Sequence, residues 1–258
     1  MSSSPPIRSV LRAIELLRAL NRQAVSTIDK LHEQTRIPKP TIVRMLQTFE
    51  YSGIVKHAPQ HGAYFLTSGV RPLTAGYHSE PVVVEAAAPL MDALTLRLKW
   101  PTAIAMLDEH AMIVRYSTIP LSPLALRHST INLRLSLVSR AIGRAYLAFC
   151  SPEQQDALIE ALSSSHEPED AGARDKPTLR RCLDQVRELG YAHRDPQVSQ
   201  ASNTLAVPVF DQHGVAASLG MTYFSSTMKP PQAVERFLGE LKETAAQIGE
   251  RLRVLQST

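Results

Sequence analysis

The segment from residue 38 to residue 53 constrains the fold more than any other, because it predicts a helix with two contrasting faces. Its apolar residues fall at positions i, i+3, i+4 and i+7: Ile42, Met45, Leu46 and Phe49. This spacing buries one face of a helix. The opposite face carries polar and basic residues, which are Lys39, Thr41, Arg44, Gln47 and Thr48. The segment therefore predicts a helix that packs by one side and presents a face without acidic groups.

Two further helices are predicted before this one. Residues 7–20 predict an amphipathic helix, because apolar residues recur there at helical spacing: Ile7, Val10, Leu11, Ile14, Leu17 and Leu20. Ser26 precedes Asp29 by three residues, which resembles a capping box with the shorter acid. This pair predicts a second helix that begins at Ser26 and ends near Gln34.

A short turn and a hairpin complete this part of the chain. Residues 35–37 predict a turn, and Pro38 suits a first helical turn because its missing N–H would have no partner there. Gly53 ends the third helix. Two short strands are then predicted over 54–58 and 63–66, around a Pro-Gln-His-Gly turn. Helix, helix, turn, helix and hairpin together predict a winged helix-turn-helix.

The distribution of charge indicates what this unit binds. Residues 1–66 carry nine Lys or Arg and four Asp or Glu, whereas the rest of the chain carries nineteen and twenty. Such a split favours a small module for a polyanion attached to a near-neutral body. Because the major groove of DNA admits one helix, we expect five residues of the third helix to face operator DNA: Lys39, Pro40, Thr41, Arg44 and Gln47. A solvated basic surface or a three-helix protein-interaction module are the alternatives.

The remainder of the chain alternates helices and strands. Residues 67–80 are a transitional stretch that we expect to contain a short linking helix. The later predicted helices cover 82–98, 141–149, 152–162, 177–189 and 231–255, and the predicted strands cover 102–107, 112–117, 204–210 and 215–223. Residues 118–137 give no clear pattern, and 163–176 predict a polar loop. Antiparallel strands flanked by helices are typical of an α+β sensor-like domain. The expected division is therefore 1–67, 68–80 and 81–258.

The sequence offers no sign of catalysis, a metal site, secretion or a membrane span. Motifs for a serine nucleophile, phosphate binding, dinucleotide binding and zinc proteolysis are all missing from the sequence. His57 and His61 lie on the expected wing rather than on one helix face, so no metal or cofactor is expected. Cys150 and Cys182 form no disulfide framework, which favours free thiols and a reducing cytoplasm. We therefore expect a cytoplasmic protein that is not an enzyme.

Several segments in order resemble the IclR family of bacterial transcriptional regulators. Residues 37–49 resemble the recognition-helix segment of the family, and 141–149 resemble its "GAGKALLA"-type segment. Gly190-Tyr191-Ala192, followed by 205–211, resembles a third family segment. Trp100-Pro101-Thr102 and residues 147–150 look most like the activators of phenylpropionate and hydroxyphenylpropionate breakdown. The resemblance thus covers nearly the whole chain.

This resemblance implies a winged helix-turn-helix, a linker helix and a GAF-like effector-binding domain. It also implies a homodimer or a dimer of dimers, and contact with RNA polymerase if the protein is an activator. The effector-pocket positions of the family correspond here to Ala141, Ile142, Arg194, Thr204, Gly220 and Thr222. Asp195 is adjacent to Arg194. Arg binds carboxylates through two parallel hydrogen bonds, so the resemblance favours an aromatic carboxylic acid as effector, unless Arg194 is a surface loop residue.

Alternation along the last predicted strand places Ser218 on the same face as Gly220 and Thr222. We expect this face to look into the effector cavity, where Gly220 leaves room. The competing assignment gives the cavity to Leu219 and Met221. Three functions remain open from sequence alone: an effector-responsive regulator, an enzyme with an accessory basic domain, and a DNA-binding architectural protein without a ligand.

Overall fold

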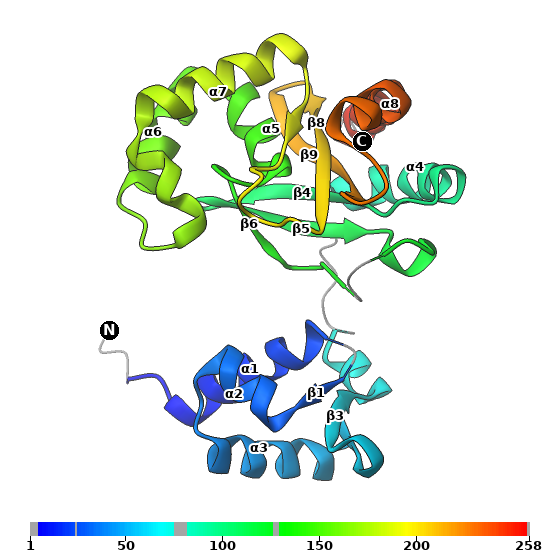
Figure 1. Cartoon of the computed structure of the whole chain (residues 1–258). Coiled ribbons are helices and arrows are strands. Elements are labelled where there is room, and N and C mark those ends of the chain that lie inside the picture. The colour runs from blue at the N-terminus through cyan, green and yellow to red at the C-terminus, as the bar shows by residue number, and fades with distance from the viewer. Residues whose placement is uncertain (1–4, 24, 75–81, 126–128, 257–258) are drawn as a thin grey trace. The chain divides into compact units, whose positions relative to one another are not determined.

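The computed structural model describes residues 5–23, 25–74, 82–125 and 129–256 (Figure 1). Its contacts divide the described residues into two compact units, one up to residue 74 together with Ser129, and the other over 82–125 and 130–256. The expected stretch 68–80 contains 3₁₀ turns over Ser68–Thr74, and its remaining residues lie outside the described ranges. Within those ranges, no helix is both long and apolar enough to cross a lipid bilayer.

The first unit confirms the predicted winged helix-turn-helix. Its helices are α1 (Arg8–Asn21), α2 (Ile28–Thr35) and α3 (Lys39–Tyr51), and its strands are β1 (Ser26–Thr27), β2 (Val55–Ala58) and β3 (Ala63–Leu66). The strands form an antiparallel sheet in the order β1-β3-β2. Leu16 and Leu20 of α1, Leu31 of α2, and Ile42 and Leu46 of α3 are at most 1% exposed. These five residues hold the three helices together.

Two details of this unit differ from the sequence-based expectation. The N-cap of α2 is Thr27, whose Oγ1 accepts a hydrogen bond from the Lys30 amide at 3.4 Å. Ser26 instead lies in β1 opposite Tyr64, and its buried Oγ has no partner among the described residues. The expected cap was one residue too early because Ser26 is extended to form the third strand of the wing.

The apolar residues expected along α1 are not all buried in the unit. Leu20 is buried, but four others expose between 43% and 67% of their surface: Ile7, Val10, Leu11 and Ile14. The inward side of the helix is formed by Leu16, Ala19 and Leu20. The helix is thus amphipathic in its last two turns only, and its first half presents an uncovered apolar face.

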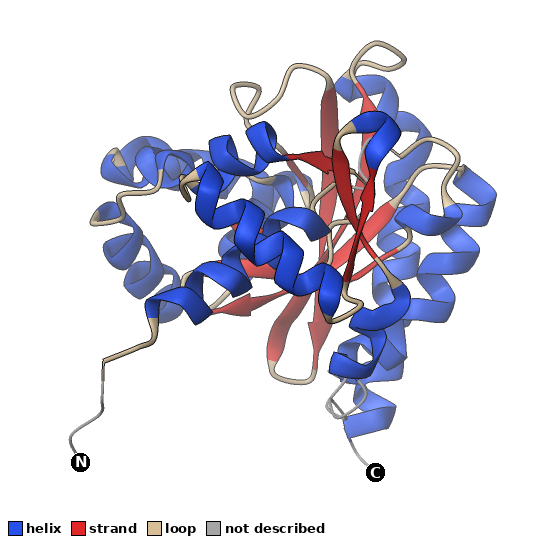
Figure 2. Cartoon of the chain, turned by 90° about the horizontal axis from the view of Figure 1, so that it is seen from below, coloured by secondary structure: helices blue, strands red, loops and turns tan. Residues whose placement is uncertain are grey.

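The second unit is built on one antiparallel six-stranded sheet in the order β6-β5-β4-β9-β8-β7. The strands are β4 (Thr102–Asp108), β5 (Ala111–Ser117), β6 (Arg134–Ser136), β7 (Ala192–His193), β8 (Ser202–Asp211) and β9 (Gly214–Phe224). The helices are α4 (Val82–Leu98), α5 (Ala141–Phe149), α6 (Pro152–Ser163), α7 (Lys176–Leu189) and α8 (Pro230–Gln256). These helices lie on both sides of the sheet (Figures 1 and 2). This architecture confirms the α+β prediction.

Each face of the sheet has its own apolar core. On one face, Leu205, Leu219 and Met221 pack with residues of α4 and α8. On the other face, Ala105 and Ala206 pack with residues of α5, α6 and α7. The small residues on this second face let α5 approach the sheet closely. As a result α5 is the helix that sits over the centre of β8 and β9.

Several short elements of the second unit were not predicted from the sequence. The segment 118–137 contains a 3₁₀ turn over Ile119–Leu121 and the edge strand β6. The polar loop expected over 163–176 contains 3₁₀ turns over Pro168–Arg174. The two-residue strand β7 was also not foreseen. All of these elements are too short to show a helical or alternating pattern of their own.

Candidate DNA-binding and effector-binding sites

The turn before α3 is fixed by side chains of α2. Arg36 adopts a left-handed conformation with φ 56° and ends α2. Thr35 Oγ1 donates to the Leu31 carbonyl at 2.7 Å and accepts from the Ile37 amide at 3.3 Å. A ring nitrogen of His32, Nδ1, bonds the Ile37 carbonyl at 2.7 Å. These bonds set the angle at which α3 leaves α2.

The outward face of α3 carries the residues expected to meet DNA. Lys39, Pro40, Arg44 and Gln47 are exposed, and Thr41 is half-buried. On the inward side, Ile42 and Leu46 are fully buried and Phe49 is 9% exposed. The two faces therefore lie as the spacing predicted, and the exposed one carries no acidic side chain before Glu50.

Lys39 pairs with an acid of the preceding helix. Its Nζ lies 2.8 Å from Asp29 Oδ1, and both side chains are more than half exposed. The hydrogen bond from Lys39 lowers the pKa of Asp29 below its ordinary value. An exposed pair of this kind contributes little to stability. Lys39 can therefore exchange this carboxylate for a phosphate at small cost.

The wing is a tight hairpin with one aromatic stack. Gly62, at φ 56°, closes the turn after Pro59–His61. The rings of His57 and Tyr64 stack with centroids 4.5 Å apart. No group of three or more His, Cys, Asp or Glu side chains suited to a metal occurs in the described ranges.

A groove of about 760 Å³ runs between α1 and α3. Its α1 wall is formed by Val10, Ala13, Ile14 and Leu17, and its α3 wall includes Arg44 and Met45. The exposed apolar side chains of α1 therefore continue into a depression that reaches the polar face of α3. Helical spacing alone could not predict this groove, because the apolar spacing of Ile14 and Leu17 looks the same whether these side chains line a core or a groove.

The expected effector-binding residues gather where α5 begins over the sheet. Ala141 and Ile142, in the first turn of α5, are 1% and 5% exposed. Ile142 lies against β9 at Gly220, where a Cβ would stand only 2.6 Å from Ile142 Cγ1. Gly220 is thus needed for this close approach. The room that Gly220 was expected to leave for a ligand is filled by Ile142.

Three hydroxyl side chains lie on the same face of β8 and β9 as Gly220. Thr204 and Thr222 are paired in register, and their Oγ1 atoms are 3.1 Å apart. Ser218 is fully buried, and its Oγ has no hydrogen-bond partner among the described residues. Leu219 and Met221 lie on the opposite face, in the core formed with α4 and α8.

Arg194 is not a surface loop residue. It is 8% exposed, and its Nη2 donates to Ser202 Oγ at 3.0 Å. The neighbouring Asp195 is held by Arg144 of α5, with 2.9 Å between Arg144 Nη2 and Asp195 Oδ2, and its amide donates to the Ser139 carbonyl at 2.8 Å. These bonds tie the loop after β7 to the start of α5. Arg144 had no sequence signal, since its partner Asp195 lies 51 residues further along the chain. Ser202 lies only eight residues from Arg194, but no sequence pattern marks that pair.

The chemistry of this region suits binding rather than covalent catalysis. Hydroxyl groups and a buried guanidinium can hydrogen-bond an anion, whereas Ser218 Oγ has no hydrogen-bond partner among the described residues that could act as its base. Both cysteines are free, as expected. Burial raises the pKa of Cys150 to about 11, so its thiol stays protonated and unreactive. Burial also raises the pKa of Tyr223 to about 12, which keeps that phenol neutral.

Comparison with protein families now identifies the chain. Residues 9–59 match the IclR helix-turn-helix domain, and residues 75–250 match the C-terminal domain described as bacterial transcriptional regulator IclR. The protein belongs to the IclR family. This result confirms the resemblance found in the sequence, and the families matched are those of regulators rather than enzymes.

Individual IclR relatives match along most of the chain. The HTH-type transcriptional regulator KdgR of Escherichia coli is 25% identical over 95% of this chain and 93% of its own length. The Pca regulon regulatory protein of Pseudomonas putida is 25% identical, covering 89% of this chain and 79% of its own. A crystal structure of an IclR homolog from Microbacterium hydrocarbonoxydans, complexed with 4-hydroxybenzoate, has a TM-score of 0.61 at 18% identity, covering 95% and 99% of the two chains.

Proposed function

We propose that this IclR-family regulator binds operator DNA through α3 and answers to a small carboxylic acid bound in its α/β unit. The observation that carries the DNA-binding part is the outward face of α3, which presents Lys39, Thr41, Arg44 and Gln47 without an acid. Pro40 lies in the first turn of α3 and is exposed beside them. Some of these side chains read base edges and others position the helix on phosphates.

We further propose that the working form is a homodimer, or a dimer of such dimers. The uncovered apolar face of α1 supports this, because Ile7, Val10, Leu11 and Ile14 are all exposed in the single chain. A second copy that covers these side chains would place two α3 helices on two half-sites. The operator is then a palindrome, and contact with RNA polymerase follows if the protein acts as an activator.

The effector we propose is an aromatic carboxylic acid that binds between the start of α5 and the β8–β9 face. The site comprises Ala141, Ile142, Arg194, Thr204, Ser218, Gly220 and Thr222, and a ligand enters it by displacing the Ile142 side chain from the space over Gly220. The burial of Arg194 beside Ser202 supports a carboxylate partner. The 4-hydroxybenzoate complex of the Microbacterium homolog and the Pca regulon protein support the aromatic class. The controlled genes would be an aromatic-acid catabolic operon.

The domain scheme that fits this function has the DNA-binding domain at 1–67, a linker at 68–80 and a GAF-like effector and oligomerisation domain at 81–258. Operator binding requires a cytoplasmic location. An enzyme with an accessory basic domain is disfavoured, because Ser218 Oγ has no hydrogen-bond partner in the described part of the chain that could activate it as a nucleophile. The remaining alternative is an architectural DNA-binding protein without a ligand. Detection of ligand binding distinguishes the proposed regulator from that alternative.

The test of the DNA-binding part is selection of genomic fragments by the full-length protein, followed by footprinting. The expected result is a protected palindrome with an affinity that falls steeply with salt. Protection without sequence preference would overturn the operator assignment. A thermal-shift screen with aromatic and aliphatic acids tests the effector, because a ligand that binds the folded state raises the apparent melting temperature. An aromatic acid should raise it and an aliphatic acid of equal charge should not.

A further inference from the structure

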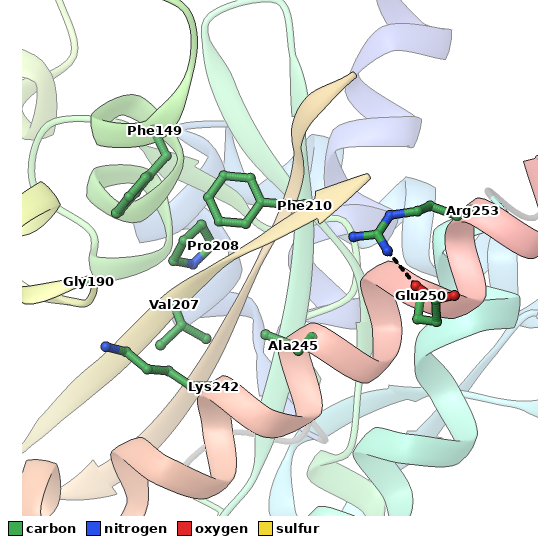
Figure 3. Close-up of a pocket in the computed structure, with 10 residues that line it drawn as sticks. Phe149, Gly190, Val207, Pro208, Phe210, Lys242, Ala245, Glu250 and Arg253 are labelled. Carbon is green, nitrogen blue, oxygen red and sulfur yellow. Dashed lines mark hydrogen bonds and ion pairs between the residues drawn. The ribbon is translucent and has the colours of Figure 1, made fainter. Parts of the chain in front are cut away.

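A pocket lies at the other end of α5 from the proposed effector site. It has a volume of about 510 Å³ and is bounded by the end of α5, the second half of β8 and one face of α8 (Figure 3). Phe149, Pro208, Phe210, Lys242 and Ala246 are among the residues that line it. This volume lies within the usual range of small-molecule sites.

The pocket lies beside the part of β8 that has no paired strand on one side among the described residues. The edge strand β7 pairs only with Leu205 and Ala206, so the strand from Val207 onward has a free edge. Pro208 has no N–H to leave unpaired there, which suits such an edge. On the other side, α8 approaches β8 closely at Gly249, where a Cβ would stand 2.3 Å from the Phe210 carbonyl oxygen. The floor is therefore rigid backbone.

The walls of the pocket are aromatic. Phe149 and Phe210 meet edge to face, with ring centroids 5.6 Å apart and an interplanar angle of 84°. Phe210 nevertheless remains 40% exposed. Figure 3 shows both rings at one side of the pocket, above Pro208 and Val207. A flat apolar group inserted beside these rings would gain favourable stacking contacts.

The charges at the rim are unequal. Lys242 Nζ donates to the Leu189 carbonyl at 3.2 Å, and no carboxylate of the described residues forms an ion pair with it. An ammonium has three donors, so two remain for a ligand. Eight residues further along α8, about 12 Å away, Glu250 pairs with Arg253 (dashed line, Figure 3). The Lys242 end is thus cationic and the other end is neutral.

We propose that this pocket binds a second small molecule, a monocarboxylate with a flat apolar body. The carboxylate accepts hydrogen bonds from Lys242 Nζ, and the body lies against Phe149, Pro208 and Phe210. The orientation follows from the difference in charge between the two ends, since Lys242 is cationic whereas the Glu250–Arg253 ion pair leaves the other end without net charge. This site is independent of the effector site, because it shares none of the residues assigned there.

The experiment uses 4-benzoylbenzoate, a carboxylate that cross-links to nearby C–H bonds under light, on the full-length protein. The label is mapped by mass spectrometry. The expected result is labelling within residues 207–210 or 242–253, suppressed by excess benzoate. Labelling by the uncharged 4-benzoylbenzamide should be about tenfold weaker, the effect of losing one charged hydrogen bond.

Matched variants separate binding from general effects. Ala246→Leu fills the pocket and Lys242→Gln removes its cation, so each should lower labelling about tenfold. Gln247→Leu places a leucine one residue away on α8, outside the lining of the pocket, and Lys229→Gln removes a charge before that helix begins; neither should change labelling. Melting curves establish that all four variants are folded.

Four outcomes would overturn the proposal. One is label found only outside these segments, and another is equal labelling by the acid and the amide. The third is unchanged labelling in Lys242→Gln, which would leave Lys242 as a capping group for the last carbonyls of α7. If Ala246→Leu also changes the oligomeric state in sedimentation, the groove is an interface between copies of the chain and the ligand site is wrong. None of these measurements depends on operator binding, so the pocket proposal can be tested even if the proposed DNA-binding function is wrong.

Discussion

Ile142 of α5 lies directly on Gly220 of β9, so that a Cβ at position 220 would stand 2.6 Å from Ile142 Cγ1 and 2.8 Å from its Cδ1. A β-branched side chain in a helix has one strongly preferred rotamer and cannot easily turn away. The contact therefore fixes how closely α5 approaches the sheet. A ligand that reaches Thr204 and Thr222 must displace or contact Ile142.

The first prediction follows from this contact. Gly220→Ala should destabilise the protein by about 1–3 kcal/mol, the usual cost of overpacking a core, and Ile142→Ala in the same chain should relieve part of that loss. Gly239→Ala, in α8 with open space around it, should instead stabilise by up to about 1 kcal/mol, because alanine favours a helix. Urea unfolding measures all four proteins. Equal effects of the two glycine substitutions would contradict the close contact.

Arg44 tests the DNA-binding face. Arg44→Ala should weaken operator binding by about 1–3 kcal/mol if it reads a guanine edge, or flatten the salt dependence by about one unit of slope if it holds a phosphate. Fluorescence anisotropy over a series of salt concentrations distinguishes the two. Arg181→Ala, which removes an exposed charge from α7, should leave affinity and slope unchanged. An unaffected Arg44→Ala protein would remove Arg44 from the interface.

Phe49 and Tyr51 test which face of α3 is the packed one. Phe49 is 9% exposed within the core of the first unit, whereas Tyr51 is 96% exposed. Phe49→Ala should cost about 3–5 kcal/mol, as expected for deletion of a core aromatic ring. Tyr51→Ala should leave stability within about 0.5 kcal/mol. Calorimetry that showed the reverse order would mean that the faces are inverted.

Substitutions at Ser26 and Thr27 test which of the two residues caps α2. Thr27→Ala removes the side chain that accepts from the Lys30 amide and should cost about 0.5–2 kcal/mol. Ser26→Ala removes a buried hydroxyl that has no partner among the described residues, so it should be neutral or slightly stabilising. Both are measured by thermal unfolding. A larger loss in Ser26→Ala would restore the cap position expected from sequence.

Acid should weaken the contact between α5 and the 3₁₀ turns over Pro168–Arg174. The hydrogen bond from Arg140 lowers the pKa of Glu169 below its ordinary value of 4.5. Because the folded-state pKa is the lower one, the stabilisation is present above about pH 4.5 and is lost as the pH falls through the folded value. Since Glu169 is partly exposed, the effect is modest. Arg140→Ala should reduce the acid dependence of unfolding, and an unchanged profile would contradict this pairing.

The first unit could be predicted from sequence because its helices are long enough to show periodicity. The stripe from Ile42 to Phe49 fixed both the position and the packed face of α3. The prediction of the N-cap of α2 was wrong. Ser26 fits the sequence rule for a cap, but it is extended in β1 and pairs with β3. The exposure of Ile14 could not be foreseen either, because an apolar stripe looks the same whether it faces a core or a partner.

In the α/β unit, too, the sequence predicted local features but not contacts between distant segments. The alternation of side chains along β9 correctly predicted that Ser218, Gly220 and Thr222 share one face, because alternation depends only on neighbouring residues of the strand. It could not reveal that Ile142 fills the space over Gly220, which depends on the close packing of α5. The pocket between Phe149, Phe210 and Lys242 has no local signature at all, because its walls come from segments far apart in the chain.

The central claim is that a ligand in the α/β unit controls operator binding by α3. The most direct measurement is titration of a labelled operator fragment with the full-length protein, with and without saturating 4-hydroxybenzoate, at several salt concentrations. We predict a preference of at least about 10³ for the operator over unrelated DNA and a change of operator affinity on adding the acid that Arg194→Ala abolishes. Equal affinity for all DNA, or an operator affinity indifferent to every aromatic acid that the protein binds, would contradict the account.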